Sequence, residues 1–261
     1  MLLLLVWGEF LPFVWGQPRT TEANWSWERG PKQATGTLGL PWQELPVAVR
    51  EEVRRVVDKP TLFVQGPAEE FIGCPKMYHW LLDHPDRAAQ AWHRLGTPVL
   101  CICNQGNGQF SWSDGQGTDV RWQTVYRAGG LRVWYAEGAG RPGWMLPTVT
   151  VRAVVVLRHD ERPLTDGVCR LGHQADMFVQ TDSKTAKILA RLLGPSIPQY
   201  AQEGLAQMEF FFSALVRYFD LYPEKAPSLL LDDRRSNSLL EPTPPATGVL
   251  QPLHYGTGSM P

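Results

Sequence analysis

A long amphipathic stretch near the C-terminus, residues 198–222 (PQYAQEGLAQMEFFFSALVRYFDLY), is the feature that most constrains the fold. Its apolar residues recur at alternating intervals of four and three, which places them on one side of an α-helix. These residues are Ala201, Leu205, Met208, Phe212, Leu215, Phe219 and Tyr222. At about 1.5 Å per residue the helix would be roughly 37 Å long. A face of this size must be buried, and the strands predicted upstream offer the apolar surface to cover it.

Short alternating runs in the middle of the chain predict an antiparallel sheet. One strand is expected in TLFVQGPAEEF, which starts at Thr61, and about six more follow between Val99 and Gln180. Glycine pairs such as Gly129-Gly130 indicate hairpins, because glycine accepts the positive φ of tight turns, and short links imply antiparallel neighbours. A short helix is expected in ELPVAVREEVRRVVDK, with Val49, Val53, Val56 and Val57 on one face and Pro60 ending it. Two more short helices are expected in CPKMYHWLLDHPDRAAQAWHRLG, and another in TDSKTAKILARLLG.

The two ends of the chain differ in composition from this central region. Residues 1–16 are an interrupted apolar run, too short to span a membrane comfortably, and are a candidate signal segment that lacks the usual basic start. Residues 17–46 resemble a linker or flexible arm, and residues 223–261 a disordered tail rich in Pro, Ser and Gly. The folded domain is expected over residues 47–222. The chain is exported or periplasmic if the first segment is a signal peptide, and cytoplasmic otherwise.

Charge, cysteine and histidine patterns argue against several classes of function. With 25 Lys and Arg against 26 Asp and Glu, no global positive field attracts nucleic acid. The four cysteines include no CxxC pair and predict neither a zinc site nor a clear disulfide framework. His79, His84 and His93 lack the i, i+4 spacing of a helical metal-binding pair, and none lies in an HExxH motif. We therefore expect no metal, no cofactor and no nucleic-acid partner.

The predicted order of elements resembles the helix-grip fold of the START-like, or SRPBCC, superfamily. The resemblance covers residues 47–222 and rests on one strand, paired short helices (KMYHWLLDHPDRAAQAWHRLG), about six antiparallel strands and a terminal amphipathic helix, not on a diagnostic motif. YHWLLDHPDRAAQAWHRLG and TDSKTAKILARLLGPSIPQ are also similar to a bacterial group of such proteins with no assigned activity.

This resemblance implies an α+β fold in which a curved antiparallel sheet of about seven strands wraps around the last helix. Proteins of the superfamily commonly hold lipids, sterols, polyketides or other apolar molecules between sheet and helix. Some members are cyclases, aromatases or hydrolases. No functional residue carries over by motif, so the site residues must be inferred from strand alternation.

Alternation predicts which side chains face the long helix, because successive residues of a strand point to opposite faces of the sheet. The inward sets are Val120, Trp122, Thr124 and Tyr126; Leu131, Val133, Tyr135 and Glu137; Val151, Ala153, Val155 and Leu157; and Leu171, His173, Ala175, Met177 and Val179. From these sets, the preceding strand and the helix we select ten candidate ligand-binding residues: Phe110, Trp112, Trp122, Tyr126, Tyr135, Glu137, His173, Met177, Met208 and Phe212.

Glu137 and His173 are the two polar residues on this otherwise apolar face. A buried carboxylate or imidazole is costly unless it is paired or hydrogen-bonded. The two residues could meet the polar group of a ligand, or act as acid and base in a dry pocket. They could equally form a structural hydrogen bond, or lie at the rim of the sheet where water reaches them.

Three functions therefore stay open at the level of sequence. The first is binding or carriage of a hydrophobic small molecule or lipid, which is compatible with transient contact with a membrane. The second is an enzyme of the cyclase, aromatase or hydrolase type that uses Glu137 and His173. The third is a structural or interaction protein with a filled core. Fold alone does not choose among them, and the oligomeric state is not encoded in these patterns.

Overall fold

The computed structural model describes residues 39–115, 117–141, 148–164, 169–182 and 196–231. The chain divides into two compact units, residues 1–230 and 231–261, and the elements below belong to the first. The helices are α2 (Val47–Asp58), α3 (Pro75–Asp83), α4 (Pro85–Arg94), α6 (Ile197–Leu221), a 3₁₀ helix (Pro223–Lys225) and α7 (Ala226–Leu230). The strands are β1 (Leu62–Gln65), β2 (Glu69–Gly73), β3 (Cys103–Gly106), β4 (Gln109–Ser113), β5 (Asp119–Ala128), β6 (Leu131–Gly140), β7 (Val149–Pro163) and β8 (Cys169–Thr181).

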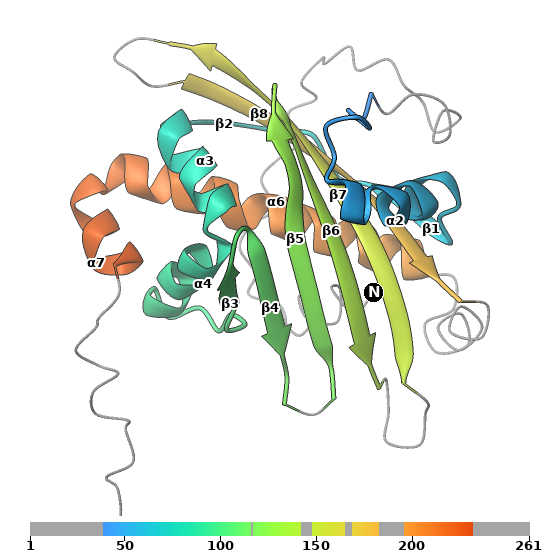
Figure 1. Ribbon diagram of the computed structural model, residues 1–261. Helices are drawn as coiled ribbons and strands as arrows, with labels where there is room; N and C mark the ends of the chain where they lie inside the picture. Colours follow the sequence, from blue (N-terminus) through green and yellow to red (C-terminus); the bar gives the residue numbers. More distant parts are fainter. Residues whose placement is uncertain (1–38, 116, 142–147, 165–168, 183–195, 232–261) are drawn as a thin grey trace, which may run out of the picture. The chain divides into compact units, whose positions relative to one another are not determined.

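The strands form one antiparallel sheet in the order β1-β8-β7-β6-β5-β4-β3, with β2 also paired to β8 (Figure 1). The fold is α+β, and the predicted helix-grip arrangement of a curved sheet with a long C-terminal helix is confirmed. The sheet has eight strands, where the sequence predicted about seven. The predicted first strand is divided at Gly66-Pro67, because proline cannot donate a ladder hydrogen bond, and both halves pair with β8.

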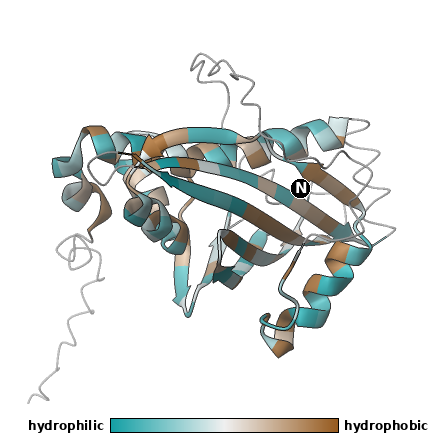
Figure 2. Cartoon of the chain, turned by 90° about the horizontal axis from the view of Figure 1, so that it is seen from above, coloured by the Kyte–Doolittle hydropathy of each residue, from teal (hydrophilic) through white to brown (hydrophobic). Residues whose placement is uncertain are grey.

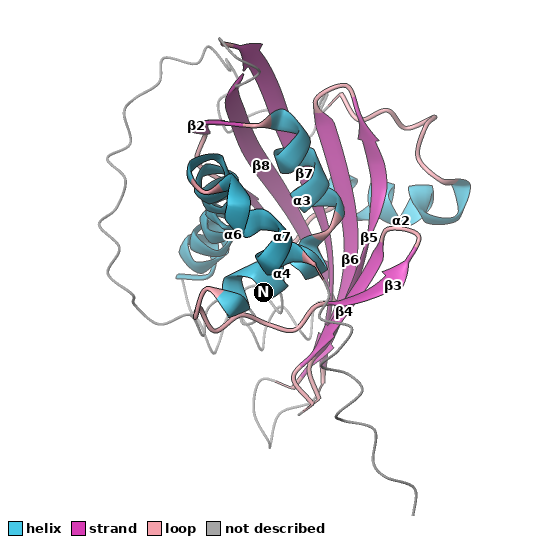
Figure 3. Cartoon of the chain, turned by 90° about the vertical axis from the view of Figure 1, so that its left-hand side faces the viewer, coloured by secondary structure: helices cyan, strands magenta, loops and turns pink. Residues whose placement is uncertain are grey.

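Helix α6 packs against the inner face of the sheet together with α3 and α4, and α2 lies on the opposite face (Figure 3). Its predicted apolar stripe is largely correct, since Ala201, Leu205, Phe212, Leu215 and Phe219 are buried. Tyr222 is an exception, because it follows the last helical residue and is 48% exposed. Four further positions, Glu209, Phe211, Ser213 and Val216, are buried and widen the contact face. No helix within the described ranges is both long and apolar enough to cross a membrane.

Helix α2 covers the outer face of the sheet and creates a second core there. Its Val49, Val53, Val56 and Val57 pack against outward-facing residues of β5 to β8, such as Val154 and Phe178. The preceding residues Leu40 and Leu45 are buried in the same core. The sheet is therefore buried on both faces over this region, which the sequence analysis did not anticipate.

The predicted inward sets of two strands are wrong, the whole set of β6 and one residue of the β5 set. The side chains of β6 are oriented opposite to the prediction: Trp134 and Ala136 point to α6, whereas Val133 and Tyr135 point to α2. Because apolar residues line both faces, their alternation does not identify the inner one. Tyr126 also lies on the outer face, because a bulge between Thr124 and Tyr126 shifts the register of β5. The inward sets of β7 and β8 are confirmed, including His173.

The chain after α6 stays ordered for longer than the composition suggested. The 3₁₀ helix and α7 follow directly, Leu230 is buried, and α7 packs against α4. Arg94 Nη1 donates a hydrogen bond of 2.6 Å to the carbonyl oxygen of Ser228. The predicted signal segment, residues 183–194 of the helix expected over residues 181–194, and the tail from residue 232 lie outside the described residues. Thr181, the first residue of that predicted helix, is the last residue of β8.

Replacing Gly73 with Ala tests the close approach of α6 to β2. A Cβ atom at this position would overlap Cγ1 of Val216, so we expect overpacking to lower the free energy of unfolding by about 1–3 kcal/mol. In a double-mutant cycle, Val216→Ala should relieve part of this cost, giving a favourable coupling of about 1 kcal/mol. Urea denaturation of wild type, the two single variants and the double variant measures this coupling free energy. Strictly additive effects of the two substitutions would contradict the contact between Gly73 and Val216.

Candidate functional site

A small apolar cavity of about 120 Å³ lies between α6, α4 and the inner face of the sheet. Eighteen described residues line it: Leu82, Pro85, Ala89, Val99, Leu100, Ile102, Trp112, Val120, Trp122, Trp134, Ala136, Val155, Met177, Gly204, Leu205, Met208, Phe211 and Phe212. None of them carries a charge. The wall is therefore built from the apolar residues of β4 to β8 on one side, and on the other from helical residues and from Val99, Leu100 and Ile102 of the segment between α4 and β3.

Aromatic side chains from the strands and the helix give the cavity its shape. Trp112, Trp122 and Trp134 come from three neighbouring strands, and the rings of Phe211 and Phe212 meet edge to face at 5.1 Å. Trp92 on α4 fixes the helix side, because its indole nitrogen donates a 3.0 Å hydrogen bond to the carbonyl oxygen of Phe211.

Half of the ten predicted ligand-binding residues line this cavity: Trp112, Trp122, Met177, Met208 and Phe212. Phe110 points to the same face of the sheet and stacks on Trp122, with ring centroids 5.7 Å apart. His173 is on the inner face too, but it belongs to a polar cluster described below.

The other three predicted residues, Tyr126, Tyr135 and Glu137, lie on the outer face and cannot line the cavity. Tyr135 Oη donates a 2.7 Å hydrogen bond to Glu137 Oε1, and Arg152 Nε lies 3.4 Å from the same oxygen. The Glu137 side chain is 59% exposed and borders an open polar depression of about 450 Å³. The predicted pairing of Glu137 with His173 is therefore wrong, because the sheet separates the two side chains.

His173 instead bridges the buried Tyr78 and the half-buried Glu69 on the inner face. Tyr78 Oη donates to His173 Nδ1 at 2.9 Å, and His173 Nε2 lies 3.2 Å from Glu69 Oε2. Burial raises the pKa of Tyr78 well above its ordinary value, so the hydroxyl keeps its proton and acts as the donor. The imidazole then carries its own hydrogen on Nε2 and donates it to Glu69.

Glu69 collects further donors from α6. Ser213 Oγ lies 3.0 and 2.9 Å from its two oxygens, which share the single hydroxyl proton, and Arg217 Nη2 lies 2.6 Å from Oε1. Burial opposes ionisation of Glu69, but His173, Arg217 and Ser213 outweigh it and lower the pKa of the carboxyl. We call Glu69, Tyr78, His173, Ser213 and Arg217 the polar cluster; it ties β2, β8 and α3 to the helix.

Glu209 is a second buried carboxyl on α6 and is held differently. Its Oε1 accepts a 2.6 Å hydrogen bond from the backbone N–H of Ala175, while Oε2 has no hydrogen-bond partner among the described residues. The side chain presses against Gly66, where a Cβ would lie 2.5 Å from Oε2. Burial, reinforced by the charges of Glu69 and Asp176, raises the pKa of Glu209 to about 9, so the carboxyl is protonated at neutral pH.

Sequence reasoning missed Glu69, Tyr78 and Glu209. Glu69 and Tyr78 are 104 and 95 residues from His173, and nothing local to a strand or helix reveals such a pairing. Glu209 did carry a signal, because it is four residues from Leu205 and therefore on the apolar side of the predicted helix. An acidic residue at such a position indicates a carboxyl that is buried and needs a partner.

Comparison with known proteins gives limited similarity. No protein-family model matches the chain, and no curated protein matches it. Among solved structures, a conserved protein from Geobacillus kaustophilus is 16% identical, with a TM-score of 0.40 over 60% of this chain and 97% of that one. A hypothetical protein from Helicobacter pylori is 14% identical, with a TM-score of 0.37 over 60% and 89%. Ara h 8.0201 is 13% identical, with a TM-score of 0.30 over 60% and 97%. Similarities this low assign neither a family nor an activity.

Replacing Glu209 with Gln should stabilise the protein in a pH-dependent way. Above the ordinary glutamate pKa of 4.5 the unfolded chain releases this proton, whereas the folded protein retains it up to about pH 9. Folding therefore takes up a proton, and the stability contributed by this residue falls as pH rises through that window. Gln needs no proton, so the variant should gain on the order of 2 kcal/mol over wild type at pH 7 and almost nothing near pH 4.

Chemical denaturation of both proteins from pH 4 to pH 9 measures this difference. Glu203→Gln is the matched control, because Glu203 is exposed on the same helix and its replacement should give no such pH dependence. A stability difference between wild type and Glu209→Gln that stays constant across the range would show that Glu209 is ionised in the folded protein.

Proposed function

We propose that this protein binds a small hydrophobic molecule, or the apolar end of a larger lipid, in the cavity between α6 and the sheet. The observation that carries the proposal is the lining itself, in which no charged side chain occurs among the eighteen described residues. Ligand pockets are commonly lined by hydrophobic and aromatic side chains of this kind. Empty apolar space inside a protein forgoes dispersion contacts, so a matching apolar guest would be stabilising.

The size of the cavity restricts the guest. An engineered cavity of about 150 Å³ lined by Leu, Ile and Phe stays dry and binds benzene, whereas drug-sized ligands occupy about 300–1,000 Å³. About 120 Å³ therefore suits one aromatic ring or a short alkyl segment. A larger molecule would insert only such a part of itself between Trp112, Trp122 and Met208.

The chemistry of the lining also favours a neutral guest. A charged group transferred into an apolar site without a partner carries a large desolvation cost. The polar cluster offers an anion no free counter-charge, because its two basic side chains, Arg217 and His173, are already engaged by Glu69. Any carboxylate or phosphate of a ligand would therefore stay outside the cavity.

The enzyme hypothesis receives no comparable support. It required Glu137 and His173 to face one pocket, and these residues lie on opposite faces of the sheet. Neither lines the apolar cavity. The remaining alternative is a structural or interaction protein with a filled core, and a binding experiment distinguishes it from a ligand-binding protein.

Filling the cavity should abolish binding. Ala89 on α4 lines it and is buried, so Ala89→Leu would place three additional carbon atoms in the space that the guest occupies. Using toluene as the probe, we expect wild type to bind with 1:1 stoichiometry in calorimetric titrations, and Ala89→Leu to bind at least tenfold more weakly. Benzoate, which is charged, should bind more weakly than toluene to wild type because its desolvation is unfavourable.

The control is Ala128→Leu, the same change at an exposed position at the end of β5, which should bind toluene like wild type. Unfolding curves of both variants establish that they are folded. Native mass spectrometry of the protein purified from its own cells, followed by organic extraction, then identifies the guest. Protein that takes up no toluene and consistently carries no extractable apolar molecule would favour the filled-core alternative.

A further inference from the structure

The long hairpin of β7 and β8 changes character along its length. The first part of β7, from Val149 to Leu157, is apolar except for the exposed Thr150 and Arg152, and polar residues follow from Arg158 to Arg162. Figure 2 shows the long strands changing from apolar brown to polar teal along their course. His159 and Glu161 are two residues apart in this polar part, so both point to the same face as Leu157, which is the face covered by α3.

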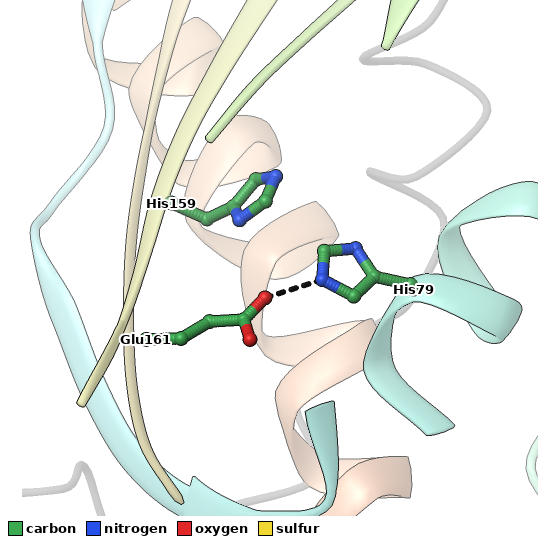
Figure 4. A group of neighbouring side chains, drawn as sticks. All are labelled: His79, His159 and Glu161. Atoms are coloured by element: carbon green, nitrogen blue, oxygen red, sulfur yellow. Dashed lines mark hydrogen bonds and ion pairs between the residues drawn. The ribbon is translucent and has the colours of Figure 1, made fainter. Parts of the chain in front are cut away.

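His79 on α3 completes a three-residue group with these two side chains. Figure 4 shows the His79 ring extending from the helix toward Glu161, with the His159 ring beside them. His79 Nε2 contacts Glu161 Oε1, and the rings of His79 and His159 lie 4.9 Å apart between centroids. One nitrogen from each imidazole and one carboxylate oxygen all lie within 4.8 Å of one another.

The third member of the group has an unused nitrogen. His159 Nδ1 is buried and has no hydrogen-bond partner among the described residues. Leaving a buried polar atom unsatisfied is unfavourable, on the order of 1–3 kcal/mol. A ligand that accepts an electron pair from this ring would remove that cost.

We propose that His79, His159 and Glu161 form a binding site for a divalent first-row transition-metal ion, with Zn²⁺ as its test ion. Two imidazole nitrogens and one carboxylate oxygen are typical ligands of Zn²⁺, whereas Mg²⁺ and Ca²⁺ prefer sets of oxygen atoms. Three protein ligands leave a fourth coordination position for water or an exchangeable anion.

The geometry requires modest side-chain adjustment. With metal–ligand bonds of about 2.0–2.2 Å, the ligand atoms of a tetrahedral site lie roughly 3.3 Å apart. The side chains of His79 and Glu161 are 37% and 36% exposed, so both have room to rotate toward His159. Tyr78 limits the movement of His159 itself, because the two rings pack edge to face at 5.8 Å.

This site is independent of the apolar cavity, since the two share no residue. The sequence predicted no metal site, because it offered His79 only together with His84 and His93 as possible ligands. The site proposed here combines His79 with two other residues. The residues that matter are 80 and 82 positions away from His79 and come beside it only through the packing of α3 on β7.

The test uses the full chain without a histidine tag, stripped with a chelator and titrated with Zn²⁺ in a calorimeter and with Co²⁺ by visible absorption. We expect one Zn²⁺ per chain and a Co²⁺ spectrum of a four- or five-coordinate site. His79→Gln and Glu161→Gln should each weaken Zn²⁺ binding at least tenfold and alter the Co²⁺ spectrum. Both replace partly exposed residues, and circular dichroism verifies that the variants are folded.

His93→Gln is the matched control, because His93 is an exposed imidazole outside the group and its loss should leave affinity unchanged. Wild-type affinity in both His79→Gln and Glu161→Gln would overturn the proposal and place any bound ion elsewhere. Absence of stoichiometric Zn²⁺ binding to the wild-type chain would overturn it as well. Neither result bears on toluene binding, so the two proposals stand or fall separately.

Discussion

The structure depends on the close approach of α6 to the β1–β2 edge of the sheet. At Gly66 and Gly73 the backbone comes so near the helix that an added Cβ would collide with Glu209 and Val216 respectively. The two glycines are seven residues apart, as are their two partners on the helix, which is the spacing of one helical face. Absence of a side chain at these positions lets one helix lie flat along the strands instead of being held off by them.

That contact arranges the interior into two chemically different parts. In one part, apolar residues of β4 to β8 and α6 leave a small apolar cavity. In the other, Glu69, His173 and Tyr78 satisfy one another in a network whose members come from three elements. The long strands β7 and β8 carry both kinds of residue in succession, so the same sheet supplies an apolar wall and a row of imidazoles and carboxylates. A helix that moved along the sheet would disturb both parts together.

The sequence predicted the elements well because they depend on local patterns. The period of α6, the paired helices around Pro85 and the Gly129-Gly130 hairpin are each encoded within a few residues, and each is present. Which face of the sheet each side chain points to was harder to predict. Val133 and Tyr135 are apolar because α2 covers them, so their alternation resembles that of inward residues, and the bulge after Thr124 moves Tyr126 across the sheet without any obvious breaker. The polar groups were least predictable, since His173 meets Glu69 and Tyr78 only after strands distant in sequence have paired.

The break at Gly66-Pro67 and the shortness of β3 also affect how the molecule behaves toward copies of itself. Edge strands with free backbone groups are templates on which a second chain can add a strand and begin to aggregate. Here one edge is divided between β1 and β2 by a proline, and the other is the four-residue β3, fully exposed and ended by a turn at Gly106 and Asn107 with positive φ. Neither edge offers a long, straight, apolar row of hydrogen-bonding groups. Both edges of this wide sheet therefore lack the features on which a second chain most readily adds a strand.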